Sequence, residues 1–315
     1  MNKHLTTDII ICTKNRPADL AKALNSIAAQ TVVPKNTIIA DASDDTKTKN
    51  LVEHLSKTNP GFKITYLKCP VPGSTFQRNY GIKHSKNEIV FFFDDDVILE
   101  SDYIENTLKV YNEHPDIGGV SGNMLNQPTY SLPYKLFKFL FFLPYTSPKV
   151  SNKLRFSGFP KVSTGQNKIT SGNFMEGGLC SYKRNILDTY YFDEKLTKYA
   201  FLEDIDLSYR VSKKYILMRT PYSRLNHYPS PSSRINRKEL RAVYTLNHFY
   251  LFVKNMPKNP ITVFAHFWSH IGLLIEGIIA AIINKNFSYI TGMFSGYNKI
   301  IKYTFSGFKN LNNQP

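Results

Sequence analysis

The stretch Glu88-Ile-Val-Phe-Phe-Phe-Asp-Asp-Asp-Val97 joins an unbroken apolar run to three consecutive carboxylates. An apolar run of this length is typical of a strand that is buried on both faces, as in a parallel sheet. Carboxylates directly after a buried strand repel one another and lose hydration, so they require a neutralising cation. Because side chains alternate along an extended chain, Asp94 and Asp96 fall on one side and Asp95 on the other. Asp94 and Asp96 are therefore a candidate site for a divalent cation; a solvated acidic turn that caps the next helix is the alternative.

The rest of the first half alternates short apolar runs with longer amphipathic segments. This alternation is typical of βαβ units, and it predicts an α/β fold with a mostly parallel central sheet flanked by helices. A turn into a short strand is expected over Phe174 to Tyr182, followed by a helix near Lys183 to Thr189. The predicted strands are Asp8 to Cys12, Thr37 to Asp41, Lys63 to Lys68, Glu88 to Asp94 and Gly118 to Met124. The predicted helices are Pro17 to Ala29, Thr46 to Ser56, Thr75 to His84 and Asp102 to His114.

Polar clusters follow several of these strands. Ligands of open α/β sheets bind beyond the carboxyl ends of the strands, so these clusters are candidate binding residues. Thr13-Lys-Asn-Arg-Pro17 follows the first strand, and Asp41-Ala-Ser-Asp-Asp45 follows the second. Each cluster also lies near a helix amino terminus, which leaves helix capping as the alternative. The residues to which this alternative applies are Asn15, Ser43, Asp44 and Asp102.

A second acidic site lies in Phe201-Leu-Glu-Asp-Ile-Asp-Leu-Ser-Tyr-Arg210, which predicts the start of a helix. Acids in a first turn stabilise the positive end of a helix, and this effect explains Glu203 and Asp206 without any ligand. Asp204 has a second interpretation as a general base, because a carboxylate can take the proton of an attacking hydroxyl. Two separate acidic sites suit a reaction in which a metal at one site stabilises a departing diphosphate and the other site activates the acceptor.

The charge of the 315-residue chain, formally +16, is unevenly distributed. Residues 1–126 contain 14 Lys/Arg against 15 Asp/Glu, whereas residues 127–315 contain 26 against 9, so the two parts carry −1 and +17. A uniformly basic chain would indicate nucleic acid; this distribution instead predicts a catalytic part, a part that faces an anion or a membrane, and no nucleic-acid partner. Cys12, Cys69 and Cys180 are widely separated, and the amino terminus lacks an apolar signal segment. Both features favour a reducing compartment without disulfides.

Residues 234–315 are expected to form a helical region that associates with a membrane. Arg237 to Lys254 is basic and amphipathic, and Ile261 to Ile283 is a long apolar stretch. Because a lipid-exposed span carries few ionisable groups near its middle, we expect the second helix to lie in the interface or to pack on a neighbour. Its polar interruptions are His266, Ser269, His270 and Glu276. Upstream, residues 128–170 form an irregular aromatic and basic insertion, which either touches a membrane or acceptor or packs in the core.

Five motifs, taken in order, resemble those of family 2 glycosyltransferases, which have the GT-A nucleotide-sugar-binding fold. The resemblance covers roughly Asp8 to His227 and is specific as an ordered set. It departs from the family pattern at Leu202, where a small residue is usual, and at Ala42, where an acid is common. The motifs are Thr13-x-Asn15-Arg16, Asp41-x-Ser43, Gln77-Arg78-Asn79-x-x-Gly81, Asp94-x-Asp96 and Glu203-Asp204-x-Asp206-Leu207 with Arg210.

The resemblance implies a division of the site into metal, acceptor and donor residues. Asp96, as the principal ligand, would hold Mn²⁺ or Mg²⁺ together with Asp94 and His227. Asp204 would be the catalytic base, with Glu203 as its partner or substitute. Asp41 would accept a hydrogen bond from the nucleotide base. Arg78 would lie near the phosphates, and Gly177 and Gly178 would shape the sugar pocket. The residues implied to bind substrates are Thr13, Asn15, Arg16, Asp41, Ser43, Arg78, Asn79, Asp94, Asp95, Gly177, Gly178 and Arg234.

The implied activity is inverting transfer of a sugar from a nucleoside-diphosphate sugar, UDP- or dTDP-linked, to a hydroxyl of a glycan or lipid-linked acceptor. It would serve bacterial cell-surface polysaccharide synthesis, with residues 1–233 as the catalytic domain. The expected location is the cytoplasmic side of the cytoplasmic membrane, on an anionic surface that holds the protein peripherally or interfacially.

Two alternatives stay open at this point. A nucleotidyltransferase for sugar phosphates would ordinarily have a glycine-rich basic loop after the first strand, and Thr13 to Pro17 is not such a loop. A non-catalytic basic module that binds membrane or nucleic acid would leave the acidic clusters dispensable.

Overall fold

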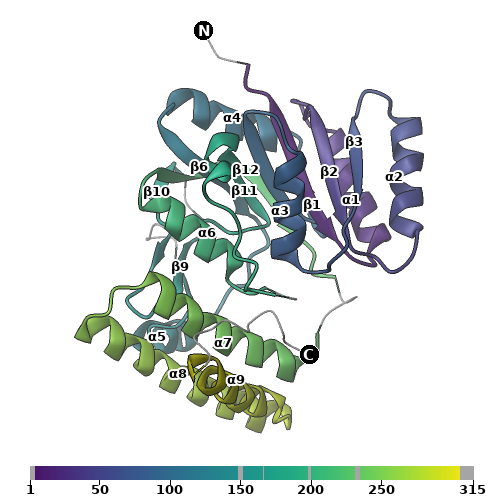
Figure 1. Ribbon diagram of the computed structural model, residues 1–315. Helices are drawn as coiled ribbons and strands as arrows, with labels where there is room; N and C mark the ends of the chain where they lie inside the picture. The colour runs from purple at the N-terminus through teal and green to yellow at the C-terminus, as the bar shows by residue number, and fades with distance from the viewer. Residues whose placement is uncertain (1–3, 148–151, 166, 198–199, 231–234, 306–315) are drawn as a thin grey trace.

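The computed structural model describes residues 4–147, 152–165, 167–197, 200–230 and 235–305. Over these residues the chain forms a nine-stranded sheet flanked by helices, with a further group of helices at one end of the molecule (Figure 1). The strand order is β10-β12-β6-β11-β4-β1-β2-β3, and β5 pairs with β12. The strands of this sheet are β1 (Thr7–Thr13), β2 (Asn36–Asp41), β3 (Ile64–Lys68), β4 (Ile89–Asp94), β5 (Val97–Leu99), β6 (Ile117–Met124), β10 (Thr170–Gly172), β11 (Leu179–Lys183) and β12 (Ile216–His227).

The centre of the sheet is parallel, as predicted. β1 pairs in parallel with β2 and β4, β2 pairs with β3, and β6 pairs with β12. β11 lies antiparallel between β4 and β6, and both β5 and β10 lie antiparallel to β12. The predicted α/β class and mostly parallel sheet are therefore confirmed. The helices are α1 (Pro17–Ala28), α2 (Lys47–Thr58), α3 (Ser74–His84), α4 (Tyr103–Glu113), α5 (Leu132–Leu140), α6 (Glu203–Ser212), α7 (Arg237–Asn255), α8 (Pro260–Asn284), α9 (Ser288–Phe305) and the 3₁₀-helix η1 (Arg184–Asp188).

Strand β4 is buried on both faces, which explains its unbroken apolar run. Phe91 and Phe93 pack in the cluster that α1 and α4 form on one face of the sheet. Phe92 packs in a second cluster, with side chains of α3 and α6, on the opposite face. A Cβ on Gly81 would stand 2.6 Å from Cγ2 of Ile10, so only glycine lets α3 lie this close to β1. The core therefore fixes α3 and α6 against the strand that carries the acidic triplet.

Several elements have no counterpart among the predicted ones. β12 contains Pro221 and mixes apolar residues with polar ones and two arginines, and its register shifts between Arg219 and Arg224. In residues 128–170 the chain forms α5 and a separate three-stranded sheet, in which β9 lies between β7 and β8. Strands of two to four residues are too short to show a period of two, which is why the sequence does not indicate them. Their bounds are β7 (Tyr145–Ser147), β8 (Lys153–Leu154) and β9 (Pro160–Ser163).

Helices α5, α7, α8 and α9 gather at one end of the molecule (Figure 1). In α8 the polar residues His266 and Ser269 are buried, whereas Phe264 and Phe267 are each more than half exposed. The polar interruptions of this apolar helix therefore face the protein, and its apolar side faces outward. Among the described residues, α8 is the one helix long and apolar enough to cross a membrane by length and composition, and 39% of its apolar window is buried.

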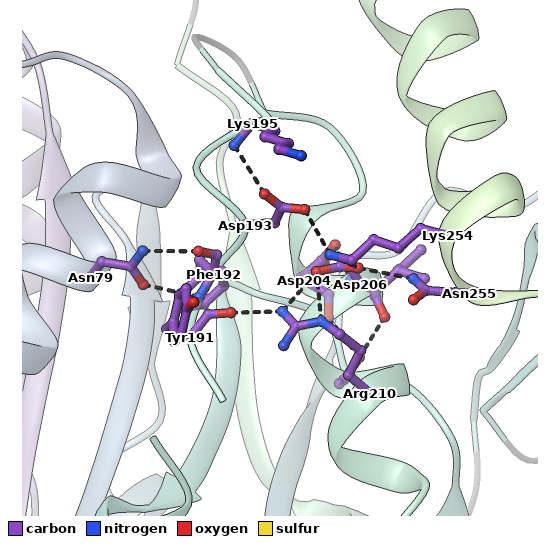
Figure 2. A network of polar contacts seen from close by, with 12 residues as sticks. Asn79, Tyr191, Phe192, Asp193, Lys195, Asp204, Asp206, Arg210, Lys254 and Asn255 are labelled. Carbon is purple, nitrogen blue, oxygen red and sulfur yellow. Dashed lines mark hydrogen bonds and ion pairs between the residues drawn. The ribbon is translucent and has the colours of Figure 1, made fainter. Parts of the chain in front are cut away.

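A buried carboxylate ties α6 to α7, as Figure 2 shows. Asp206 is fully buried, and its Oδ2 accepts hydrogen bonds from Nε and Nη2 of Arg210 at 2.9 and 2.7 Å. Its Oδ1 lies 2.8 Å from Nζ of Lys254 and accepts a hydrogen bond from Asn255 at 2.9 Å. Lys254 also contacts Asp193, 2.7 Å away. The acidic start of α6 is therefore anchored to the carboxyl-terminal end of α7.

Asp206→Asn should destabilise the protein by about 3 kcal/mol, because it leaves the partly buried Arg210 without its carboxylate partner and Lys254 with Asp193 alone. The measurement is the free energy of unfolding from urea titration. Glu53→Gln is the matched control, since it removes one partner of the exposed pair Lys49–Glu53, 3.8 Å apart, and should leave stability unchanged. Equal stability of the Asp206 variant and the wild type would mean that this network does not hold α6 to α7.

Candidate active site

A cleft of about 680 Å³ opens beyond the carboxyl ends of β1 and β4. The strand order reverses between these two strands, and such a switch point is where open α/β sheets bind ligands. The predicted clusters after the first and fourth strands and the start of α6 all contribute to it. Its lining residues are Cys12, Thr13, Lys14, Asn15, Arg16, Asp44, Pro72, Gly73, Ser74, Gln77, Arg78, Asp94, Asp95, Asp96, Glu203, His227, Ile235 and Glu239.

Asp95 forms part of the floor of the cleft and is held by the loop after β1. Its Oδ2 accepts a hydrogen bond from the Thr13 hydroxyl at 2.7 Å, and its Oδ1 lies 3.1 Å from Nη1 of Arg16. Burial raises the pKa of Asp95 to about 6, and Arg16 and Thr13 oppose that rise. Thr13 and Arg16 are therefore bound to the acidic turn itself.

Asp94, Asp96 and His227 form the opposite face of the acidic turn. One ligand atom from each lies within 4.8 Å of the others, and Nε2 of His227 is 2.9 Å from Oδ1 of Asp96. The second oxygen of Asp96 accepts the backbone N–H of Ser230 at 3.0 Å. Burial disfavours the charge on Asp96, but His227 and Ser230 together hold its pKa below the usual range.

This donor set fits a divalent cation. Two carboxylates and one neutral imidazole suit Mn²⁺, and two carboxylates alone suit Mg²⁺ as well. The Asp94 side chain is 40% exposed and that of Asp96 only 6%, but Asp94, Asp96 and His227 all line the cleft, so a ligand in the cleft can reach them. The residues that would hold the cation are therefore Asp94, Asp96 and His227.

Two features that the sequence does not indicate position His227. The last residues of β12 pair with β5, so that His227 stands opposite Val97, directly after the acidic turn. The backbone N–H and C=O of His227 bond to the amide side chain of Asn126, at 2.9 and 2.7 Å. Asn126 is thus a positioning residue that no motif indicates, because its role depends on the pairing of β12.

Arg78 connects the acidic turn to the start of α6. This arginine is 5% exposed; its Nη2 lies 3.1 Å from Oδ1 of Asp94, and its Nη1 lies 2.6 Å from Oε1 of Glu203. Burial disfavours its charge, but Glu203 and Asp94 keep the pKa of Arg78 above its ordinary value. Burial also raises the pKa of Glu203, and the adjacent Arg78 opposes that rise. The two acidic sites therefore share one guanidinium.

Asp204 lies next to this bridge and is held by backbone groups. Its Oδ2 accepts the N–H of Gly177 and its Oδ1 accepts the N–H of Ile205, both at 2.8 Å. Burial raises the pKa of Asp204, while the Gly177 hydrogen bond and Arg78 lower it. Glu203 lines the cleft, and Asp204 is the next residue in the chain and lies beside Gly177.

Gly177 and Gly178 allow the backbone to approach both acidic sites. A Cβ on Gly177 would stand 2.9 Å from Cβ of Asp204, and a Cβ on Gly178 would overlap the carboxylate of Asp94. The backbone at these two glycines therefore lies close to the side chains of Asp204 and Asp94 of the protein itself.

The residue before the Glu-Asp pair, Leu202, has a φ of 72°. This left-handed conformation favours glycine, so the small residue that the resemblance expects has a physical reason, and Leu202 is strained.

Several of the described candidate residues do not line the cleft: Asp41, Ser43, Asn79, Gly177, Gly178 and Asp204. Asp41 is fully buried: its Oδ1 accepts the N–H and hydroxyl of Ser43, and its Oδ2 accepts the Tyr66 hydroxyl at 2.8 Å. Ser43 in turn accepts the N–H of Asn15 at 2.8 Å. In this geometry Asp41 shapes the loop that carries Asn15, and its expected contact with a nucleotide base stays a prediction.

Asn79 differs from its expected position in the same way. Its side chain is buried and hydrogen-bonds both backbone groups of Phe192, at 2.9 Å each, as Figure 2 shows. It secures the segment before α6, because its donors and acceptor are taken up by that segment. Arg234 lies outside the described residues.

Comparison with known proteins decides the family. The model of glycosyl transferase family 2 matches residues 8–190, which is more than half of the chain. The chain belongs to glycosyl transferase family 2. This membership favours the glycosyltransferase interpretation over the nucleotidyltransferase and non-catalytic alternatives. The cleft that the predicted motifs line is therefore the candidate active site of this family 2 chain.

Two curated relatives share parts of the chain. The GalNAc(5)-diNAcBac-PP-undecaprenol beta-1,3-glucosyltransferase of Campylobacter jejuni is 30% identical over 105 residues, 33% of this chain and 34% of the relative. The minor teichoic acid biosynthesis protein GgaB of Bacillus subtilis is 29% identical over 97 residues, 30% of this chain and 11% of the relative. The matches thus span about a third of the length of the first relative and about a tenth of the second.

Among solved structures, the mannosyltransferase PcManGT from Pyrobaculum calidifontis in complex with GDP-Man and Mn²⁺ resembles this family 2 glycosyltransferase over most of its length. The TM-score is 0.59 at 15% identity, and the match covers 95% of this chain and 88% of the other. At that identity the likeness concerns the fold, and it confirms the predicted GT-A architecture.

Gly178→Ala should weaken Mn²⁺ binding by roughly tenfold or more, because the added methyl group displaces a carboxylate from the donor set. Titration of free Mn²⁺ by electron paramagnetic resonance measures the affinity. Gly61→Ala is the control, since nothing lies within 4 Å of the added Cβ. A folded Gly178 variant with wild-type affinity would remove Asp94 from the metal site.

Proposed function

We propose that this glycosyltransferase moves a sugar, with inversion, from a nucleoside-diphosphate sugar to a hydroxyl of a glycan or lipid-linked acceptor. The observation that carries the proposal is that the acidic turn and Glu203 line one cleft, with Arg78 between Asp94 and Glu203 and with Asp204 next to Glu203 in the chain. In an inverting transfer the diphosphate leaves from one face of the sugar ring, and the acceptor hydroxyl, deprotonated by a base, attacks from the other. The separation of the two sites across Arg78 provides these two positions.

The acidic turn is the proposed donor side. Asp94, Asp96 and His227 would hold Mn²⁺ or Mg²⁺, which when bound would neutralise charge on the leaving diphosphate. Lys14 and Arg16 line the same cleft and offer cationic donors to phosphate oxygens. Asn15 and Asp44, which hydrogen-bond each other at 2.8 Å, would form the wall beside the nucleoside. Arg234 keeps its proposed role at the diphosphate as a prediction from the sequence.

Asp204 is the proposed base. The N–H of Gly177 holds Oδ2 of Asp204 with one hydrogen bond. Because a carboxylate oxygen has two lone pairs, this oxygen can still accept the proton of a hydroxyl. Glu203 is engaged by Arg78 at 2.6 Å, so its proposed role is to position that guanidinium. The proton of the acceptor hydroxyl would pass to Asp204 as the oxygen attacks the sugar.

The proposed setting is bacterial cell-surface glycan or teichoic acid synthesis at the cytoplasmic face of the membrane. The named relatives support it: one is a glucosyltransferase acting on an undecaprenol-linked glycan and the other a teichoic acid biosynthesis protein. The outward apolar side of α8 adds physical support, because apolar residues beside a basic region suit an anionic lipid surface. Residues 1–233 would form the catalytic domain and residues 234–315 the membrane-associating region.

Nucleoside-diphosphate release from a panel of UDP-, dTDP- and GDP-sugars, with and without Mn²⁺, tests the reaction. We expect release with at least one donor, dependent on the cation. Asp204→Asn should bind that donor normally but transfer on the order of a hundredfold or more slowly, because it lacks the base. Glu203→Gln is the comparison, and a larger loss there with full activity in Asp204→Asn would reassign the base.

The acid limb of the kcat/KM profile should lie above the range of an exposed aspartate, about 3.9. Burial raises the Asp204 pKa, and only the ionised form accepts a proton, so the rate should fall as pH decreases through that raised value. Stopped assays in buffers from about pH 4 to about pH 9 would record the limb. An acid limb that is unchanged in the residual activity of Asp204→Asn would assign it to another group.

The double variant Phe264→Ser/Phe267→Ser should partition onto anionic vesicles roughly a hundredfold or more weakly than the wild type, since burial of each phenylalanine contributes about 1.5–3 kcal/mol and about 1.4 kcal/mol corresponds to tenfold. Vesicle flotation is the measurement. Val33→Ser/Val71→Ser is the matched control, because these side chains are also about half exposed but lie in the neutral first half of the chain. Equal flotation of the two double variants would exclude α8 as the membrane-facing surface.

A further inference from the structure

A second cavity, of about 440 Å³, lies between α7, α8 and α9, apart from the catalytic cleft. Its walls combine aromatic and aliphatic side chains with two arginines and several neutral donors, and none of its lining residues is acidic. A cavity with this lining suits a ligand that is both apolar and negatively charged. The lining residues are Phe201, Arg237, Leu240, Arg241, Tyr244, Ala280, Asn284, Asn286, Ser288 and Tyr289.

Arg241 supplies a buried positive charge to this cavity. It is 9% exposed, and among the described residues no carboxylate lies within ion-pair distance of it. Its Nε has no hydrogen-bond partner there, and Nη2 reaches only Sδ of Met293, a weak acceptor, at 3.9 Å. Its Cζ stands 3.9 Å from the ring centre of Tyr289, which lowers the cost of burial without neutralising the charge. An anion in the cavity would provide the acceptors that Arg241 lacks.

The same two segments of the chain line this cavity and the catalytic cleft. Along residues 235–241, Ile235 and Glu239 line the cleft, whereas Arg237 and Arg241 line the second cavity. Arg237, Arg241 and Tyr244 recur at helical spacing, so they share one face of α7, and the cleft lies on another. Phe201, just before α6, lines the second cavity, and Glu203, the first residue of α6, lines the cleft. The two cavities are therefore neighbours, separated by the first turns of α7.

The cavity lies beside the apolar outer surface of α8. Ala280 and Asn284 line it, and Ile279 and Ile283, their neighbours in α8, are 48% and 73% exposed. Phe287, between the cavity residues Asn286 and Ser288, is 66% exposed. An apolar chain leaving the cavity would therefore pass onto an apolar surface, whereas a free small anion would have no use for it.

We infer that this cavity is the binding site for the phosphate and first apolar segment of a phosphate-bearing lipid, the acceptor of the proposed reaction. The phosphate lies beside Arg241 and Arg237, and the chain continues over Ala280 towards the outer side of α8. A glycan on that phosphate then extends past the start of α7 into the cleft, where Asp204 meets its hydroxyl. The role of this lipid as acceptor rests on the proposed function, but its binding to the cavity does not depend on sugar transfer.

Calorimetric titration below the micellar concentration, with three probes, tests the site in the full-length protein. Dodecyl phosphate has both charge and chain, dodecan-1-ol has only the chain, and inorganic phosphate has only the charge. We expect dodecyl phosphate to bind at least roughly tenfold more tightly than either of the others, because each lacks one of the two contributions. Equal affinity for dodecan-1-ol, or for inorganic phosphate, would overturn the inference.

Variants locate the binding. Ala280→Trp fills the cavity, and Ile282→Trp adds the same side chain on the 70% exposed outer side of the same helix. Dodecyl phosphate should bind at least roughly tenfold more weakly to Ala280→Trp and Arg237→Gln, and unchanged to Ile282→Trp. Arg241→Gln should abolish binding; if it does not fold, the other variants decide. Affinity unchanged in Ala280→Trp would place the lipid elsewhere.

The outcome is separable from that of the proposed reaction. Failure of every nucleotide sugar to release its diphosphate would remove the reaction and leave the titrations as a test of the cavity. Turnover with wild-type dodecyl phosphate binding in Ala280→Trp would keep the reaction and remove the cavity. Donor binding should be the same in Ala280→Trp and Ile282→Trp, because neither residue lines the catalytic cleft.

Discussion

The buried guanidinium of Arg78 is the interaction on which the arrangement of the cleft depends. It lies between Asp94, at the end of the central strand, and Glu203, at the start of α6. Without this charge the carboxylates of the turn and of α6 would repel one another in a partly dehydrated site. The core explains why Arg78 stands there, since Gly81, one turn further along α3, permits the contact with Ile10 that brings α3 onto the sheet.

The sequence was sufficient for the first half of the fold because each strand there is a continuous apolar run followed by polar residues. The expected bounds of those five strands agree with the observed ones to within one residue. β12 could not be found in this way, because it mixes Pro221 and charged residues with apolar ones and changes register. Its position matters, since β12 delivers His227 to the acidic turn.

The candidate site was predictable where residue type alone limits the chemistry, and not where a partner decides the role. Asp94, Asp96 and His227 converge as the resemblance implies, because the two carboxylates end the central strand and the pairing of β12 with β5 brings the imidazole to them. Asp41 and Asn79 carry the same motif signal, but Ser43, Tyr66 and Phe192 occupy their polar atoms. Ser43 belongs to the same motif as Asp41, but Tyr66 and Phe192 come from other segments of the chain, which no local pattern encodes.

The bonds of Asp206 to Arg210 and Lys254 tie the helix that carries the proposed base to α7, and α7 packs on α9, which in turn contacts α8 with its outward apolar side. If those helices rest on a bilayer, the cleft stands at a constant height above it. Reach then becomes a selection rule: an anchored glycan presents its hydroxyl to the base only within a narrow range of lengths. A chain too short or too long would be excluded by distance alone, whatever its terminal sugar.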